Sequence, residues 1–217
     1  MRDPRPIIAI LVKAPRPGDV KTRLATEMGH ESAARLARAF FEDTLSTAVA
    51  VTDARVAVVV AGDPALLPTL PAAVSVWPQG EGELGARMER ALRRALAEAP
   101  RAIVIGTDAP GLPPALLLSA VRAMDCDAVL GPADDGGFYL LGLDRCPMGL
   151  LEALPWSSAS TLACTQARLE DRGYRVHVLP SWFDVDTPAD LARLRRSLAA
   201  GEMRAPRTEA LLRDGIG

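Results

Sequence analysis

The chain has 217 residues and a formal net charge of −2, and hydrophobic residues make up 49% of it and charged residues 24%. This length suits one domain with a sizeable core, and the composition is that of an ordinary globular protein. The near-neutral charge excludes an electrostatic case for binding nucleic acid or anionic membranes. We therefore expect a single domain over residues 1–217, with a polar tail at 201–217 that packs as a short surface helix.

Cysteine and histidine are scarce, and the cysteines form no CxxC pair. These residues are Cys126, Cys146, Cys164, His30 and His177. Neither a structural zinc site nor a disulfide framework is expected from so few. The apolar run at residues 7–12 is too short for a signal peptide or a membrane span. These features predict a cytoplasmic protein.

Strand and helix patterns alternate from the start of the chain. Residues 7–12 (IIAILV) form an apolar run typical of a buried strand, and residues 31–51 place apolar and alanine positions at helical spacing. Between them, two prolines and Gly18 rule out a helix in the first half of residues 13–24. The next expected elements are strands at 55–60 and 74–77 and a helix at 84–99.

The same alternation continues to the end of the chain. Residues 102–105 (AIVI) are a short apolar run closed by turn residues, which predicts a buried strand that delivers Asp108 at its carboxyl end. Further expected elements are a helix at 113–124, strands at 128–130 and 138–143, a helix ending near 173, a strand at 175–179 and a helix reaching 200. This order predicts a three-layer α/β domain with a mostly parallel sheet.

Asp108 is the first candidate functional residue. Open α/β sheets bind ligands at the carboxyl ends of their strands, and an acid there can anchor a Mg²⁺ ion that carries a substrate's phosphates. The alternative is that Asp108 only caps a turn or the next helix.

Residues 13–24 (KAPRPGDVKTRL) contain four cations after the first strand. These are Lys13, Arg16, Lys21 and Arg23. Backbone amides and cationic side chains at a strand end can hold a polyphosphate. The loop lacks the glycine spacing of a P-loop, and the alternative reading is a solvated basic loop.

Two further segments are weaker signals. Residues 80–85 match GxGxxG but follow the third strand and carry two glutamates, so we favour close backbone approach to a nucleobase or ribose over a dinucleotide fingerprint. Asp184 and Asp186 would face one side of an extended segment. Helix capping by Thr187 and Asp190, with Pro188 at the first helical position, explains that segment without a functional site.

Five motifs in order resemble a known family: KAPRPGDVKTRL, QGEGELGARM, GTDAPGL, GPADDGGFYLLGL and DVDTPADL. Together they cover residues 7–194 and resemble bacterial GT-A-fold, nucleotide-diphospho-sugar-transferase-like proteins related to 2-phospho-L-lactate guanylyltransferase. The resemblance implies a Rossmann-like GT-A domain that binds a nucleotide. One departure is that the first loop has fewer glycines than sugar-nucleotide transferases usually carry, so its cations would take over more of the phosphate binding.

The resemblance also implies roles for single residues. Asp108 and Asp186 would bind the metal, Mg²⁺ or Mn²⁺, although Asp184 could replace Asp186. Asp135 would face the acceptor or the transferred group, and Lys21, Asp108 and Asp135 would be catalytic. The implied nucleotide-binding residues are Lys13, Lys21, Arg23, Gln79, Gly80, Gly85 and Arg87.

The function that follows is a metal-dependent transferase. Four cations favour a triphosphate, and hence nucleotidyl transfer from an NTP to a small phosphorylated or acidic acceptor. Two alternatives stay open: a glycosyltransferase that uses a nucleotide-sugar, and a nucleotide-binding regulatory protein without catalysis. The expected partners are the donor and a small-molecule acceptor, without nucleic acid or membrane. The sequence leaves open the nucleotide, the acceptor and whether the chain forms a homodimer.

Overall fold

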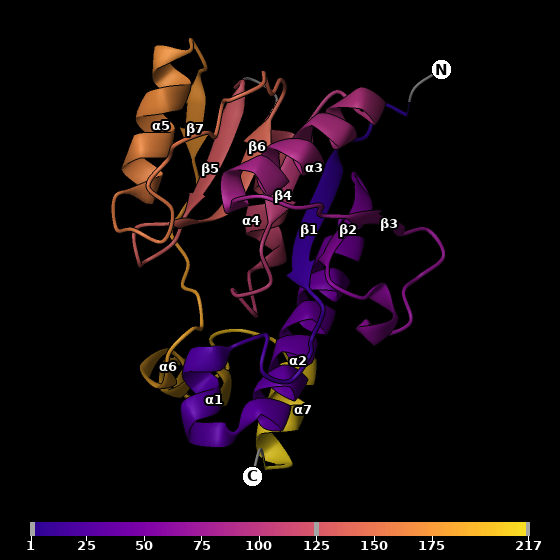
Figure 1. The fold of residues 1–217 in the computed structure, drawn as a ribbon, viewed down its shortest axis with the longest axis vertical. Helices are drawn as coiled ribbons and strands as arrows, with labels where there is room; N and C mark the ends of the chain where they lie inside the picture. Colours follow the sequence, from indigo (N-terminus) through magenta and orange to yellow (C-terminus); the bar gives the residue numbers. More distant parts are fainter. Residues whose placement is uncertain (1–2, 124–125, 216–217) are drawn as a thin grey trace.

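The computed structural model describes residues 3–123 and 126–215. Its centre is a seven-stranded sheet with the order β3-β2-β1-β4-β6-β5-β7 (Figure 1). The strands are β1 (Ile7–Lys13), β2 (Arg55–Ala61), β3 (Ser75–Pro78), β4 (Ala102–Ile105), β5 (Ala128–Pro132), β6 (Phe138–Leu143) and β7 (Val176–Val178). All neighbouring strands pair in parallel except β6, which is antiparallel to β4 and β5. The predicted mostly parallel sheet is confirmed.

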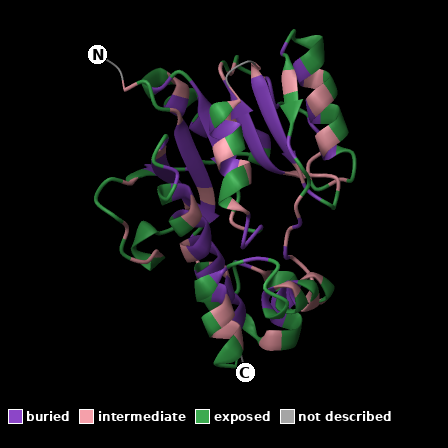
Figure 2. Cartoon of the chain, turned by 180° about the vertical axis from the view of Figure 1, so that it is seen from behind, coloured by how far each residue is buried: buried purple, intermediate pink, exposed green. Residues whose placement is uncertain are grey.

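Apolar runs in the sequence become the central strands because both faces of the sheet are covered by helices. The helices are α1 (Thr22–Met28), α2 (His30–Val49), α3 (Leu84–Glu98), α4 (Pro114–Arg122), α5 (Thr161–Asp171), α6 (Pro188–Ala199) and α7 (Pro206–Arg213), and a 3₁₀ turn lies at Pro64–Leu66. One core cluster joins the sheet to α2 and α4, and a second joins it to α3 and α5. Figure 2 shows the buried strands between more exposed helices.

A third hydrophobic cluster lies beyond the carboxyl end of β1. Its residues come from α1, α2, α6, α7 and the segment before α6, with the fully buried Phe40 and Leu36 among them. In Figure 1 these helices form a separate group below the sheet. The buried Asp43 of α2 ties α7 into this group, because its carboxylate accepts hydrogen bonds from the amides of Arg207 and Thr208, both at 2.9 Å. The sheet edge therefore faces a second packed layer.

The helix α1 was not expected from the sequence. It begins directly after Lys21, and Gly29 separates it from α2 with a φ of 82°. Glycine reaches this backbone conformation without a steric penalty, so the chain can turn between two helices there. The prolines and Gly18 do keep residues 14–20 non-helical, as expected.

Other boundaries agree with the sequence patterns to within a few residues. The predicted capping box at α6 is confirmed, because Thr187 accepts from the Asp190 amide and Asp190 accepts from the Thr187 amide. The helix expected at 113–124 begins at Pro114 and ends at Arg122, and residue 124 lies outside the described residues. Among the described residues, no helix is long and apolar enough to span a membrane.

Candidate functional site

An open cleft of about 720 Å³ lies at the carboxyl ends of β1 and β4. One wall is the loop between β1 and α1, and the floor includes the end of β4 at Asp108. The segment before α6 supplies Asp184 and Asp186. The other wall consists of the turn after β5 and the loop before α5. Several of the predicted site residues therefore share one cavity, as the carboxyl edge of a parallel sheet allows.

Lys21 lies at the centre of the acidic residues. Its Nζ atom forms ion pairs with Oδ1 of Asp108 and, at 2.9 Å, with Oδ1 of Asp186. The same ammonium donates to the carbonyl of Val185 at 2.8 Å and lies 5.4 Å from the centroid of the Phe40 ring. Three acceptors therefore use the three donors of this ammonium.

The burial of Lys21 makes these pairings important, because only 6% of its side chain is exposed. Burial alone would lower the pKa of Lys21, but the charges of Asp108 and Asp186 outweigh it and raise the pKa above the ordinary lysine value. The backbone of Lys21 is left-handed, with φ 46° and ψ 42°, at the start of α1. This uncommon conformation for a residue with a side chain is held where the acids meet the ammonium.

The carboxylates of Asp108 and Asp186 remain open to the cleft, with side-chain exposures of 51% and 45%. The amide of Val185 donates to the carbonyl of Asp108 at 2.8 Å, which joins the segment before α6 to the end of β4. Among the described residues, no three His, Cys, Asp or Glu side chains are arranged as a ready-made metal site. Two carboxylates suffice for Mg²⁺, which often binds proteins through one or two carboxylates plus substrate phosphates and water.

Asp184 is the acid that sequence reasoning judged least well. Burial raises its pKa to about 7, and the negative charges of Asp108, Asp135 and Asp186 act in the same direction. The sequence placed Asp184 beside Asp186 on one side of an extended segment, but it contained no sign that Asp184 would be desolvated. A carboxyl group that is difficult to ionise within an acidic cluster marks a candidate functional site.

Lys13 and Arg23 line the same cleft on the side of the β1–α1 loop. The Lys13 ammonium donates to the carbonyl of Asp19 at 2.8 Å, a contact that holds the loop against the end of β1. Arg16 belongs to the same loop but does not line the cavity. Of the four cations, two thus face the cleft without contacting the acids, and Lys21 is engaged by them.

The GxGxxG segment contributes less to the cavity than expected. Of Gln79, Gly80, Gly85 and Arg87, only Gln79 lines it, and its amide nitrogen donates to the carbonyls of β-strand residues, including Val59 at 3.1 Å. A Cβ on Gly85 would lie 2.5 Å from the Leu151 carbonyl oxygen. Close packing therefore explains Gly85 without a ligand.

Side-chain contacts account for the other members of this segment. Arg87 donates to the carbonyl of Gly82 at 2.7 Å. Arg90, which sequence reasoning did not select, donates to the carbonyls of Gln79 and, at 3.0 Å, Glu81. A Cβ on Gly80 would collide with the Arg90 guanidinium. Arg90 thus shapes the loop, and its place on one face of the α3 pattern was the only signal in the sequence.

The opposite wall has a different chemistry. The ring of Trp156 packs edge-on against Phe138 with centroids 6.1 Å apart, and both line the cleft. Thr161 shapes the loop before α5 by donating to the carbonyl of Pro155 at 2.6 Å. The amide of Leu162 donates to the carbonyl of Gly136 at 2.8 Å, which docks this loop on the turn that carries Asp135. The Ser/Thr-rich stretch was visible in the sequence, but its position beside the cleft was not.

Asp135 itself faces this wall of the cleft. Its Oδ1 atom accepts a hydrogen bond from the Gly137 amide at 2.8 Å, in the turn chemistry that the sequence indicated. Two explanations of Asp135 therefore hold together, since one oxygen shapes the turn and the side chain still borders the cavity.

Comparisons with known proteins extend these observations. The family described as "Uncharacterized protein conserved in bacteria (DUF2064)" matches residues 44–158. A Desulfovibrio desulfuricans G20 protein, assigned provisionally as a nucleotide-diphospho-sugar transferase, is 32% identical and has a TM-score of 0.86. That alignment covers 98% of this chain and 95% of the other. A search of curated proteins found no match.

More distant structures share the fold. The 4-diphosphocytidyl-2C-methyl-D-erythritol synthase of Anaerococcus prevotii DSM 20548 is 16% identical, with a TM-score of 0.61 over 91% of this chain and all of the other. Rv0371c of Mycobacterium tuberculosis H37Rv, in complex with manganese, is 19% identical, with a TM-score of 0.56 over 90% of this chain and all of the other. The predictions of the α/β fold, of the resemblance to this group of proteins and of a transferase are confirmed at this level.

Proposed function

The chain belongs to the family described as uncharacterized bacterial proteins (DUF2064), and from this premise we propose that it is a metal-dependent transferase that binds a nucleotide donor in the cleft. One observation carries the proposal: the exposed carboxylates of Asp108 and Asp186 lie at the carboxyl end of the sheet, in one cavity with the cations Lys13 and Arg23. Paired acids beside cations are what a metal-bound polyphosphate requires. The Desulfovibrio relative, a provisional nucleotide-diphospho-sugar transferase, supports the same reading.

Asp108 and Asp186 would hold the divalent cation, Mg²⁺ or Mn²⁺. The bound cation would supply positive charge to the donor phosphates and to the leaving group. Lys13 and Arg23 would bind phosphate oxygens and orient the donor along the β1–α1 loop. Gln79 would border the nucleoside. Such a site accelerates transfer mainly by positioning and by electrostatic stabilisation, without a protein nucleophile.

Nucleotidyl transfer from an NTP is the first candidate reaction. An acceptor oxygen forms a bond to the α-phosphorus, the bond from that phosphorus to the β-phosphate oxygen breaks, and pyrophosphate leaves. Two free cations and a metal would together offset the charge of a triphosphate better than one alone. The printed functions of the fold neighbours include cytidylyltransferases, which is consistent with this reaction.

Glycosyl transfer is the second candidate, and a specific observation favours it. The wall formed by Asp135, Phe138, Trp156, Ser157 and Ser158 contributes no Lys or Arg to the cavity within the described residues. A phosphorylated acceptor would find no cation there, whereas the hydroxyl groups and aromatic face of a sugar would find hydrogen-bond partners and a platform. Asp135 could take the proton of the attacking hydroxyl group.

A donor panel separates the two candidates. We would measure thermal stabilisation and turnover with the four NTPs and with UDP-, GDP- and ADP-sugars, each with Mg²⁺ or Mn²⁺. Larger shifts with an NTP, together with pyrophosphate release, would identify nucleotidyl transfer. Larger shifts with a nucleotide-sugar, together with release of the nucleoside diphosphate, would identify glycosyl transfer.

The variant Asp108→Asn should remove the metal dependence of donor binding, and Asp171→Asn, which replaces an exposed acid at the end of α5, serves as its matched control. Donor binding without any turnover would support the regulatory alternative. Absence of metal-dependent binding with every donor would contradict the proposed function.

A further inference from the structure

The position of Lys21 has a consequence that the proposed metal site does not contain by itself. Its ammonium contacts Oδ1 of both Asp108 and Asp186, the two carboxylates that would hold the divalent cation. The third donor goes to the Val185 carbonyl, and the Phe40 ring lies on another side of the ammonium. A positive charge is therefore already built into the place where the metal's own ligands meet.

The ammonium cannot easily leave this place. Only 6% of the Lys21 side chain is exposed, and a buried ammonium without partners is strongly destabilised. The backbone of Lys21 also anchors the start of α1, which packs in the third hydrophobic cluster through Leu24. Lys21 is thus a fixed feature of the folded chain rather than a mobile surface cation.

A fixed cation here opposes a second one. The ammonium already offsets one of the two negative charges of Asp108 and Asp186, and it would repel a divalent cation a few ångströms away. The electrostatic attraction that remains for a bare metal ion is therefore reduced. The phosphates of a nucleotide would restore it, because they add negative charge and further oxygen ligands on the cleft side.

We propose that Lys21 is the resident counter-ion of the carboxylate pair, and that it makes divalent metal binding depend on the nucleotide phosphates. Lys21 is then a positioning residue that acts through Asp108 and Asp186. This role differs from the direct phosphate contact expected from the sequence. The metal enters together with the nucleotide, and the acidic cluster does not collect divalent cations without substrate. This inference rests on the proposed metal site at Asp108 and Asp186.

The test is direct binding of Mn²⁺, which needs no turnover. Electron paramagnetic resonance of free Mn²⁺ would be recorded for the wild type and for Lys21→Met, with and without ADP, CDP, GDP or UDP, against protein-free controls. We expect the wild type to bind Mn²⁺ at least about tenfold more tightly with its best diphosphate than alone. We expect Lys21→Met to bind Mn²⁺ alone at least about tenfold more tightly than the wild type does, because one repelling charge is gone.

Lys13→Met is the matched control. Its ammonium is in the same loop but donates to the Asp19 carbonyl rather than to a carboxylate. Removing it should change the affinity for Mn²⁺ alone by less than about twofold. A gain in affinity that appears with Lys21→Met and not with Lys13→Met locates the effect at the carboxylate pair.

Several outcomes would overturn the inference. One is a folded Lys21→Met protein that binds Mn²⁺ alone no more tightly than the wild type. Another is a wild type that binds Mn²⁺ equally well with and without a diphosphate; this measurement needs no variant, and Lys21→Gln provides a second substitution if the first does not fold. If Asp108→Asn abolishes Mn²⁺ binding in either case, the proposed metal site stands and only the role of Lys21 fails. Absence of Mn²⁺ binding under every condition would instead overturn the proposed function itself.

Discussion

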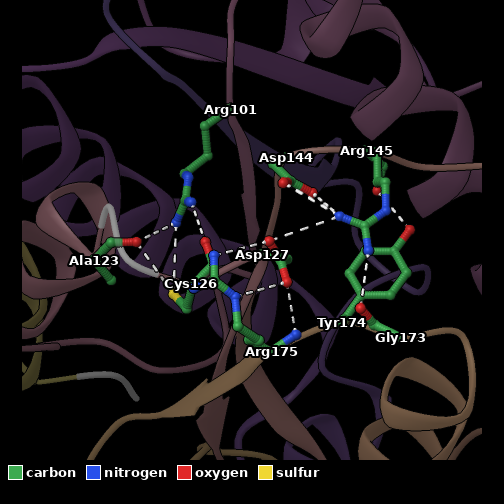
Figure 3. Close-up of polar contacts among 9 residues, drawn as sticks. All are labelled: Arg101, Ala123, Cys126, Asp127, Asp144, Arg145, Gly173, Tyr174 and Arg175. Carbon is green, nitrogen blue, oxygen red and sulfur yellow. Dashed lines mark hydrogen bonds and ion pairs between the residues drawn. The ribbon is translucent and has the colours of Figure 1, made fainter.

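The amino and carboxyl ends of the sheet treat charged side chains in opposite ways. At the amino end, Asp127 precedes β5 and is paired with Arg175 at 3.3 Å and with Arg145 at 3.8 Å (Figure 3). Arg145 also pairs with Asp144 at 3.1 Å. Hydrogen bonds from Arg175 hold the pKa of the Asp127 carboxyl below its ordinary value. Acids and cations there are matched.

The carboxyl end holds more acid than cation at its centre. Asp108, Asp135, Asp184 and Asp186 border one cleft, and the buried ammonium of Lys21 contacts two of them. Burial and the neighbouring acids raise the pKa of Asp184 to about 7. Matched charges stabilise a fold, whereas unmatched charges are retained where a ligand completes them. This difference separates the structural end of the sheet from the candidate functional end.

The largest effect is expected from Asp108→Asn. The variant removes one negative charge from the proposed metal ligands, so transfer from the donor should fall about 10²–10³-fold while the fold is kept. Steady-state rates with the best donor would show it. Asp127→Asn, at the other end of the sheet, is the comparison, and an equal loss of rate in both variants would contradict the functional division of the two ends.

Asp184 should give stability a pH dependence in metal-free buffer. Its folded pKa of about 7 lies above the unfolded value of 3.8, so the folded state binds more protons between these values. Stability is therefore fully present below about pH 4 and falls as the pH rises through 7, by an amount of about 2–3 kcal/mol once partial exposure is allowed for.

Replacing the acid removes this dependence. Asp184→Asn should be more stable than the wild type at pH 8 and differ little from it at pH 4. Urea denaturation at a series of pH values measures both proteins. Parallel pH profiles for the two proteins would show that Asp184 is not desolvated as described.

Arg101 tests the amino end. Its side chain is buried and donates to the carbonyls of Ala123 and Cys126, next to the paired acids in Figure 3. Arg101→Met keeps much of the volume but leaves these carbonyls without their charged donor, at a cost of about 1.5–2 kcal/mol. Chemical denaturation gives the loss, and donor binding in the cleft should be unchanged. Weaker donor binding would show that the two ends are coupled.

The smallest effect is expected from Asp127→Asn. Because pairing lowers the folded pKa of Asp127, its contribution is present above the unfolded pKa and is lost as the pH falls below about 4. This dependence is opposite in sign to that of Asp184. The wild type and the variant should therefore converge in melting temperature in acid and separate slightly at neutral pH. A difference that grows in acid would contradict the pairing.

Much of the framework could be predicted from local patterns. The apolar runs at β1, β2 and β4, the spacing in α2 and α3, and the capping box at Thr187 are consequences of neighbouring residues. The placement of Asp108 after a buried strand also followed from the chain, because the carboxyl ends of parallel strands share an edge. The helix α1 was missed because its start depends on the left-handed backbone of Lys21, which no local pattern indicates.

What the sequence by itself determined was the set of elements, their order and the side chains available at the strand ends. Only the tertiary structure decided how those side chains meet. Lys21 lies 165 positions from Asp186, and the packing of α1 and α6 brings both beside Asp108. Burial, pairing and pKa depend on these distant neighbours and on excluded water, so no local pattern contains them. The cation expected to face a phosphate is for this reason found between two acids.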